Sequence, residues 1–461
     1  MIRSGPVRLL VVALFFAAIL LASAGCTAPS GAPPAPVAAT PSAPSQDCNC
    51  PSLIFTDPEF AFELTRTLAA AYAGEADIGE CLTTASRIRD SDFESWYTEW
   101  KKTADHFRAA GDESLKAGHT VTARDAYYRA ATYYRTAEFF LHGNPADPRI
   151  VETWGMSRTA FRDALALDTV PHEIVAIPYG NTTLPGYFYN VDSSDKARPL
   201  LIVQTGFDGC QEELHPYALE GLKRGYNVLT FEGPGQGEVI RMQHLPFRAD
   251  WENVIIPIID YAAGRPDVDP DRIALWGISL GGYLAPRGTA YEPRIAALIA
   301  DGGVFDVGET FRAGMKKTGG LVPDMTTAEL QAWLRTDPAA FNAMMQQAMA
   351  ENTGTRWMTE HGMFVFNASS PALFYAGYMD MTLEGSAEKI RCPTLVTAGA
   401  ADPFDPGAVQ ARALYDHLTC EKDLLVFPDR FGAGTHCQLG AFAQSFAAKF
   451  DWLDQAMNRT R

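Results

Sequence analysis

Basic residues are scarce in this sequence. Its 461 residues include 38 Lys and Arg against 55 Asp and Glu, which gives a formal net charge of −17 at pH 7. Nucleic acids and anionic lipid surfaces are bound through clustered positive charge. The charge balance therefore argues against a nucleic-acid partner and against an electrostatic attachment to a membrane.

Cysteine is sparse as well, with eight in the whole chain, too few for a fold held together by disulfides. Cys48 and Cys50 have no matching second pair at metal-binding spacing, so we expect no metal site. The glycine-rich stretch Gly233–Gly237 lacks the Lys-Ser/Thr pair of a phosphate-binding loop. We interpret this stretch as a tight loop beside a site and expect no cofactor.

The first 25 residues have the pattern of an export signal. Arg3 and Arg8 precede a wholly apolar run, Leu9–Leu21, and small residues follow it. The run is shorter than the roughly 20 apolar residues that span a bilayer, which disfavours a permanent transmembrane helix. We therefore expect residues 1–25 to be a signal peptide.

The sequence Ser23-Ala24-Gly25-Cys26 resembles a bacterial lipobox, in which the cysteine is lipidated. On this hypothesis a lipid on Cys26 anchors the protein to the bacterial cell envelope. The lipid anchor would be the only part of the protein that contacts the membrane. Ser23 stands where an aliphatic residue is usual, so the alternative is cleavage after Ala24 and a secreted or periplasmic product. Residues 26–52 are rich in Ala and Pro, which predicts an extended linker.

The other cysteines suggest two disulfides as hypotheses. Cys392 and Cys420 each stand just before a strand-like run. If those strands are parallel neighbours, the two thiols lie at the same sheet edge and can form a bridge. As a second hypothesis, Cys48 or Cys50 pairs with Cys81. Such bridges would fit an oxidising compartment.

The apolar residues divide the rest of the chain into two regions. Residues 53–170 have helical spacing, which predicts an N-terminal domain of four to six helices. Residues 171–461 begin with a hairpin pattern and continue with short apolar runs that alternate with helical ones, which predicts an α/β catalytic domain. Its mostly parallel sheet would carry helices on both faces. The strand-like runs are 200–204, 228–231, 273–276, 297–300, 394–397 and 424–427.

Residues 306–389 interrupt this alternation between the fourth and the fifth run. They are rich in Met and aromatic residues, which form adaptable apolar surfaces. We expect a helical cap insertion over the carboxyl edge of the sheet. The alternative is a group of extra helices packed elsewhere.

A strand-like run leads directly into Gly277-Ile278-Ser279-Leu280-Gly281. A nucleophilic serine needs a sharp strand-to-helix turn that exposes its hydroxyl, and glycines two positions before and after it relieve the crowding. The strand before this motif and the helical pattern after it supply that context. Ser279 is therefore the candidate nucleophile.

A serine hydroxyl needs a base and a carboxylate that orients the base. Asp402 follows the fifth run at its carboxyl end, and His436 precedes the last helical stretch. These positions predict a catalytic Ser-Asp-His triad in that chain order. Asp405 is the alternative acid, and Asp429 is a weaker one because it stands on the strand that precedes the histidine.

An oxyanion hole needs two backbone amides. We assign them to Leu280, which follows the nucleophile, and to Phe207, in the loop after the first central run. Asp208 beside it either caps the following helix or acts on the substrate as an acid or base. Three other histidines are expected in the core or on the surface, with a place in the wall of the site as the alternative: His215, His244 and His361.

Three motifs resemble a known family: Gly206–Glu213, Phe231–Glu238 and Trp276–Tyr283. They are similar to the α/β-hydrolases grouped with dihydropseudooxynicotine hydrolase and the fermentation-respiration switch protein. That group also has a helical N-terminal domain, so the resemblance covers roughly Phe55 to the C-terminus. It implies an α/β-hydrolase fold and either ester hydrolysis or cleavage of carbon–carbon bonds in ketones. It also places Asp208 at an acidic position of the nicotine-pathway enzyme, with Asp in place of Glu.

These observations together predict an exported serine hydrolase that cleaves an apolar ester or acyl compound through an acyl-enzyme. An alternative within the same chemistry is hydrolysis of a carbon–carbon bond in a ketone or diketone, with Asp208 as an additional acid or base. An alternative from another class is a lipoprotein that binds a ligand on a hydrolase scaffold without catalysis.

Overall fold

The computed structural model describes residues 54–317 and 325–459. The predicted signal peptide, the lipidation site Cys26 and the linker lie outside these ranges, as do Cys48 and Cys50. Within the described residues, none of the helices has both the length and the apolar content that crossing a membrane requires.

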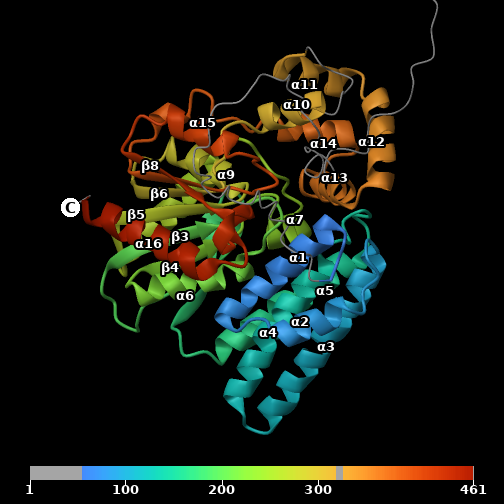
Figure 1. The fold of residues 1–461 in the computed structure, drawn as a ribbon. Coiled ribbons are helices and arrows are strands. Elements are labelled where there is room, and N and C mark those ends of the chain that lie inside the picture. The colour runs from blue at the N-terminus through green and yellow to red at the C-terminus, as the bar shows by residue number, and fades with distance from the viewer. Residues whose placement is uncertain (1–53, 318–324, 460–461) are drawn as a thin grey trace, which may run out of the picture.

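Five α-helices within the described residues precede the sheet, and they confirm the predicted helical N-terminal region (Figure 1). Four of them begin after an aspartate whose carboxylate accepts amide hydrogen bonds of the first turn. Trp96 and Trp100 are fully buried in the core of this region. The helices are α1 (Pro58–Ala69), α2 (Ile78–Ala85), α3 (Phe93–Lys116), α4 (Thr120–Glu138) and α5 (Pro148–Ala166).

The sheet has eight strands among the described residues, in the order β1-β2-β4-β3-β5-β6-β7-β8. β1 and β2 form the predicted antiparallel hairpin, β2 pairs antiparallel with β4, and all other neighbours are parallel. This arrangement confirms the predicted α/β fold. The strands are β1 (His172–Tyr179), β2 (Thr182–Tyr189), β3 (Arg198–Gln204), β4 (Asn227–Phe231), β5 (Val268–Ile278), β6 (Ile295–Asp301), β7 (Thr394–Gly399) and β8 (Lys422–Phe427).

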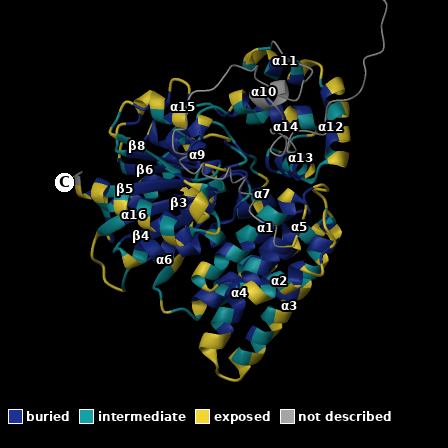
Figure 2. Cartoon of the chain, in the orientation of Figure 1, coloured by how far each residue is buried: buried dark blue, intermediate teal, exposed yellow. Residues whose placement is uncertain are grey.

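Helices cover the sheet on both faces, and Figure 2 shows the central strands between them as buried. Two helices pack together on one face, α6 (His215–Lys223) and α16 (Phe442–Arg459). The other face carries α8 (Glu252–Ala263) and α9 (Gly281–Thr289). Burial from both sides explains why the central strands carry runs of apolar residues, such as 200–203 and 273–276, without the alternation of strands that have one face in water. Two further helices lie at the ends of strands, α7 (Gly237–Gln243) after β4 and α15 (Val409–His417) between β7 and β8.

The segment between β6 and β7 forms a separate group of helices, drawn in yellow and orange in Figure 1. It lies beside α1 and α7, and the amide of Phe247 donates to the carbonyl of Val365 at 3.0 Å. Its Met and aromatic side chains bury one another and the adjoining loops. The helices are α10 (Val307–Lys317), α11 (Thr327–Thr336), α12 (Ala339–Glu351), α13 (Thr353–Val365) and α14 (Pro371–Tyr378).

Candidate active site

Ser279 lies on a sharp turn between β5 and α9. Its φ is 62°, a left-handed conformation that is strained for a residue with a side chain. Tight packing holds the turn: a Cβ at Gly277 would lie 2.0 Å from the carbonyl oxygen of Gly281. The amide of Ser279 donates to the carbonyl of Asp301 at 2.8 Å, which ties the turn to the end of β6. This is the geometry that exposes a nucleophile at a sheet edge.

The structure brings Ser279, His436 and Asp402 into one hydrogen-bonded chain. The Oγ of Ser279 lies 2.8 Å from Nε2 of His436, and Nδ1 of His436 lies 2.7 Å from Oδ2 of Asp402. Asp402 follows β7, and His436 precedes α16. Burial alone would lower the pKa of His436, but the Asp402 carboxylate outweighs it and raises the pKa well above its ordinary value.

The two alternative acids have other positions. The carboxylate of Asp405 accepts hydrogen bonds from the amides of Gln410 and Ala411, at 2.9 and 3.1 Å, and so holds the first turn of α15. Asp429 begins a short 3-10 helix after β8. Asp402 is the acid that contacts His436.

The loop after β3 packs directly against the Ser279 turn. A Cβ at Gly206 would lie 2.5 Å from the amide nitrogen of Leu280 and 2.9 Å from the Cβ of Ser279, so this position requires glycine. Among the described residues, the amides of Phe207 and Leu280 donate to no protein acceptor. Two amide donors therefore lie beside the serine without a partner.

Asp208 does not cap the helix that follows it. Cys210 occupies the cap position of that helix, and its amide donates to Glu213 at 3.0 Å. Asp208 instead accepts a hydrogen bond from Nη1 of Arg66 on α1, at 3.0 Å. Burial alone would raise the pKa of Asp208, but Arg66 outweighs it and lowers the pKa, so the carboxylate is ionised at neutral pH.

Arg66 is the centre of a largely buried charge cluster that joins α1 to the loop after β3. It also binds both carboxylate oxygens of Glu213, at 2.9 and 3.0 Å. Arg135 on α4 contacts Glu213 and Glu63, both at 3.1 Å. Bidentate contacts of this kind fix geometry as well as charge. The helical region therefore holds the loop that carries Phe207 and Asp208.

Aromatic side chains from several elements surround the reacting groups. The ring of Phe404 lies 4.7 Å from the His436 ring, and that of Phe62 on α1 lies 6.4 Å from it. Phe207 contacts Trp357 on α13 and Tyr378 on α14, at centroid distances of 6.3 and 5.6 Å. The surroundings of the serine are therefore apolar, with contributions from the helical region and from the insertion.

The three other histidines have three different environments. His215 is buried and lies 2.5 Å from Glu75, and His244 is exposed at the end of α7. His361 on α13 contacts the loop after β3, because its Nε2 lies 3.0 Å from the carbonyl oxygen of Phe207. Of the three, His361 is the one that adjoins the candidate site.

Several residues at the site carry no sequence signal of their own. Arg66 and Phe62 lie on an ordinary amphipathic helix, more than a hundred positions from the residues that they contact. The sequence places Gln236 in a tight glycine-rich loop, and the structure shows that its side chain contacts the loop after β3. The glycine-rich motif around Gln236 was the one signal that pointed to any of them.

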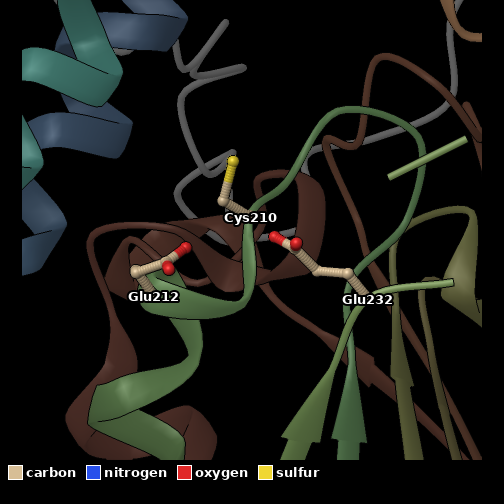
Figure 3. A group of neighbouring side chains, drawn as sticks. All are labelled: Cys210, Glu212 and Glu232. Carbon is tan, nitrogen blue, oxygen red and sulfur yellow. The ribbon is translucent and has the colours of Figure 1, made fainter. Parts of the chain in front are cut away.

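Figure 3 shows a buried group outside the serine site, formed by Cys210, Glu212 and Glu232. Their potential ligand atoms lie within 4.8 Å of one another. Among the described residues, these three are therefore close enough together to hold a metal ion. Glu232 accepts hydrogen bonds from two amides, and Glu212 accepts one from the hydroxyl of Tyr187. Burial, followed by the charge of Glu212, raises the pKa of Glu232 to about 8. The protonated forms that burial favours are poor metal ligands.

The predicted disulfide between Cys392 and Cys420 is wrong, since both are free thiols. The thiol of Cys420 instead lies 3.6 Å from the hydroxyl of Thr394 at the start of β7. Burial raises the pKa of Cys392 to about 12, which leaves little of the reactive thiolate. The suggested partners of Cys81 lie outside the described residues.

Known proteins of similar sequence are hydrolases. The chain is 36% identical over 424 residues to Hydrolase LUC6 of Fusarium sp, which covers 88% of this chain and 99% of that protein. It is also 36% identical over 417 residues to 20-hydroxy-prefusarin hydrolase FUS2 of Gibberella moniliformis, covering 87% of this chain and 97% of that protein.

Solved structures of similar fold include 2,6-dihydroxy-pseudo-oxynicotine hydrolase, at a TM-score of 0.66 and 19% identity, covering 85% of this chain and 95% of that one. At this identity the likeness concerns the fold, and it extends over the helical region as well as the sheet. The model of the alpha/beta hydrolase family matches residues 204–443, more than half of the chain. The expected resemblance is thereby confirmed: this chain belongs to the alpha/beta hydrolase family.

Proposed function

We propose that this hydrolase cleaves an ester or acyl carbonyl with Ser279 as nucleophile, His436 as base and Asp402 as the group that orients it. The observation that carries the proposal is the continuous hydrogen-bonded chain from Ser279 to Asp402, at 2.8 and 2.7 Å. This chain starts at the strand-to-helix turn, where Ser279 has a positive φ. Strained backbone of this kind is found most often at functional sites.

In the proposed reaction, Oγ of Ser279 attacks the carbonyl carbon while Nε2 of His436 takes its proton. The negative charge that forms on the carbonyl oxygen is stabilised by the amides of Phe207 and Leu280. Collapse of this intermediate breaks the bond to the leaving group, which takes the proton from His436 and leaves an acyl-enzyme. Water then repeats the sequence and releases the acid.

The substrate proposed is a small apolar molecule, enclosed between the core (171–461), the helical domain (53–170) and the insertion (306–389) as a cap. The rings of Phe62, Phe404 and Phe207 around the reacting groups support an apolar substrate. The contacts of α1 and α13 with the site support the closure by the helical domain and the cap.

Labelling with a fluorophosphonate probe tests the catalytic proposal. We expect the wild-type protein to be labelled and Ser279→Ala to show only background. Ser194→Ala, on an exposed loop, serves as the matched control and should be labelled like the wild type. An unlabelled but folded wild-type protein would favour the binding scaffold without catalysis.

A second candidate function is hydrolysis of a carbon–carbon bond in a ketone or diketone. The observation that favours it is the ionised carboxylate of Asp208 next to the proposed oxyanion amide. Such a carboxylate can act as an additional base and take a proton from the attacking water. Ester cleavage does not need this additional base, because His436 already accepts that proton. The relevant variant is Asp208→Asn, assayed with para-nitrophenyl butyrate and with an aryl diketone.

Glu213→Gln is the matched control for that variant, since it removes another carboxylate that Arg66 binds. Loss confined to diketone cleavage in Asp208→Asn, and absent in Glu213→Gln, would support the second function. Equal losses on both substrates, or no loss, would contradict it.

We also propose that residues 1–25 direct export and that Cys26 carries a lipid. The sequence pattern of this segment supports the proposal, and secretion after cleavage at Ala24 is its alternative. Metabolic labelling with palmitate tests it: incorporation in the wild type and none in Cys26→Ser is expected. Absence of label from the wild type would contradict the anchor.

A further inference from the structure

The loop after β3 has a second set of contacts, made by Gln236 in the turn before α7. The side chain of Gln236 is 2% exposed. Its Nε2 donates to the carbonyls of Thr205 and Gly206, at 3.0 and 2.9 Å. Its Oε1 accepts from the amide of Gly233 at 2.9 Å. Every polar atom of the amide thus has a partner of the right kind, so its orientation is unambiguous.

The contact with Gly206 determines where the amide of Phe207 points. The carbonyl of Gly206 and the N–H of Phe207 belong to one planar, trans peptide group, in which they point in opposite directions. The hydrogen bond from Gln236 draws the carbonyl to one side, so the N–H is directed to the other. Because Gly206 packs on Ser279 and Leu280, that peptide group lies beside the nucleophile.

His361 acts on the next peptide group in the same way. A carbonyl oxygen accepts only, so Nε2 of His361 carries the proton that is donated to Phe207 at 3.0 Å. Burial, followed by the charge of His142, lowers the pKa of His361 to about 3, so the ring is neutral and its Nδ1 accepts. Nδ1 of His142 lies 2.9 Å away and donates to it, and His142 is itself held 2.9 Å from Glu138.

We propose that Gln236 and His361 are positioning residues for the oxyanion hole: by holding the carbonyls of Gly206 and Phe207, they direct the amide of Phe207 at the oxygen of the tetrahedral intermediate. This inference rests on the proposed serine chemistry. Gln236 comes from the core and His361 from the insertion, so two separate parts of the chain set the geometry of one loop. Neither side chain touches the substrate in this proposal.

Gln236→Met removes the donor and keeps a side chain of similar length. With para-nitrophenyl butyrate we expect kcat to fall roughly 10-fold to 100-fold, within the loss that follows removal of a whole oxyanion donor. KM should not change, because the oxyanion forms only after binding. Binding of an aryl trifluoromethyl ketone, whose adduct with serine carries the oxyanion, should weaken by the same factor. Binding of the corresponding alcohol, which forms no adduct, should not.

Gln243→Met is the matched control. Gln243 is the last residue of α7, the helix that Gln236 precedes, and its Nε2 also donates to a backbone carbonyl, that of Thr183 in the β1–β2 hairpin, at 2.9 Å. We expect its kcat and its affinity for the trifluoromethyl ketone to equal those of the wild type. A comparable loss in Gln243→Met would show that the effect is a general loosening of the fold and would overturn the proposal.

His361 supplies the second, independent variant pair. His361→Met removes the donor and should lower kcat without changing KM, whereas His361→Gln retains an N–H donor and should recover part of the loss. If Gln236→Met fails to fold, this pair still tests the inference. A labelled wild type with normal kcat in both Met variants would overturn the positioning role alone. An unlabelled wild type would instead overturn the proposed function.

Discussion

At Ser279 the backbone keeps a conformation that costs energy, of order 1–3 kcal/mol for such a residue. Close packing maintains it. Gly277 lets β5 and α9 approach so closely that a Cβ there would displace backbone, and a Cβ at Gly281 would lie 3.0 Å from the carbonyl oxygen of Thr205 after β3. The strain is thus compensated by contacts that only glycine permits.

Alanine at position 277 would therefore destabilise the protein. Its Cβ would lie 2.0 Å from the carbonyl oxygen of Gly281, which is backbone and cannot move aside. We expect a loss of about 1–3 kcal/mol in the free energy of unfolding, measured by urea denaturation, together with loss of probe labelling. Gly264→Ala is the control, because its Cβ would meet nothing nearer than 3.4 Å. Equal stability of the two variants would refute the packing argument.

The pH dependence of kcat/KM should follow His436. The base must be neutral, so activity is lost as the pH falls through the pKa of His436, which Asp402 raises above its ordinary value. In Asp402→Asn that support is gone, so the acid limb moves to lower pH and kcat falls by roughly 10³–10⁴-fold. Asp405→Asn should leave the limb in place, since Asp405 holds α15. An unshifted limb in Asp402→Asn would contradict the assignment.

The sequence predicts some site residues and not others for a physical reason. Ser279 and its neighbouring glycines form a local pattern, and Asp402 and His436 follow from chain order and the elements that precede or follow them. Arg66 has no such pattern, because its role depends on how α1 docks on a loop far along the chain. The glycine-rich motif marks the loop that contains Gln236, but it does not show which carbonyls the side-chain amide binds, because that depends on how the loop packs against the one after β3.

Among the elements, α1 is the one that carries the helical region into the site. Phe62 and Arg66 are four positions apart and so share one helix face. That face meets His436 and Asp208, while Phe60 and Leu64 on another face are buried in the region's own core. The helical spacing of residues 53–170 predicts helices in this region, but no sequence pattern shows that the face with Phe62 and Arg66 contacts another part of the chain.

Removal of the Arg66 guanidinium should be costly because it leaves Asp208 without its cationic partner and leaves Glu63 and Glu213 with Arg135 alone. For Arg66→Met we expect a loss of about 3–5 kcal/mol in the free energy of unfolding, the cost of breaking a buried ion pair. The matched control is Arg89→Met on the same region, whose side chain is 74% exposed and pairs with Asp92. It should cost at most about 1 kcal/mol. Similar denaturation midpoints for the two variants would contradict a structural role for the cluster.

On the scale of the whole molecule, Glu138 lies where the three parts of the chain meet. It stands at the end of α4 and binds Arg241 on α7 of the core, at 2.7 Å. It also contacts His142, which reaches His361 of the insertion. Because Glu138 and Arg241 form a buried ion pair, separating the helical region from the core would leave both charges buried without a partner, and separating the insertion would remove the contact of His361 with His142. The helical region, the core and the insertion are therefore expected to unfold together.

Acid unfolding tests this expectation with a defined sign. Burial alone would raise the pKa of Glu138, but Arg241 and His142 outweigh it and lower the pKa to about 2. A lowered carboxyl pKa contributes stability that is full above the unfolded value of about 4.3 and is lost as the pH falls towards 2. The variant Glu138→Gln should be less stable than the wild type at neutral pH, and it should lose less stability than the wild type on acidification. The control is Glu94→Gln, which removes an exposed partner of Arg149 and should behave like the wild type. Near-ultraviolet and far-ultraviolet circular dichroism, followed along the same acid titration, should give one shared transition in each protein. Two separate transitions would mean that the helical region detaches before the core unfolds, and that the contacts of Glu138 do not join them.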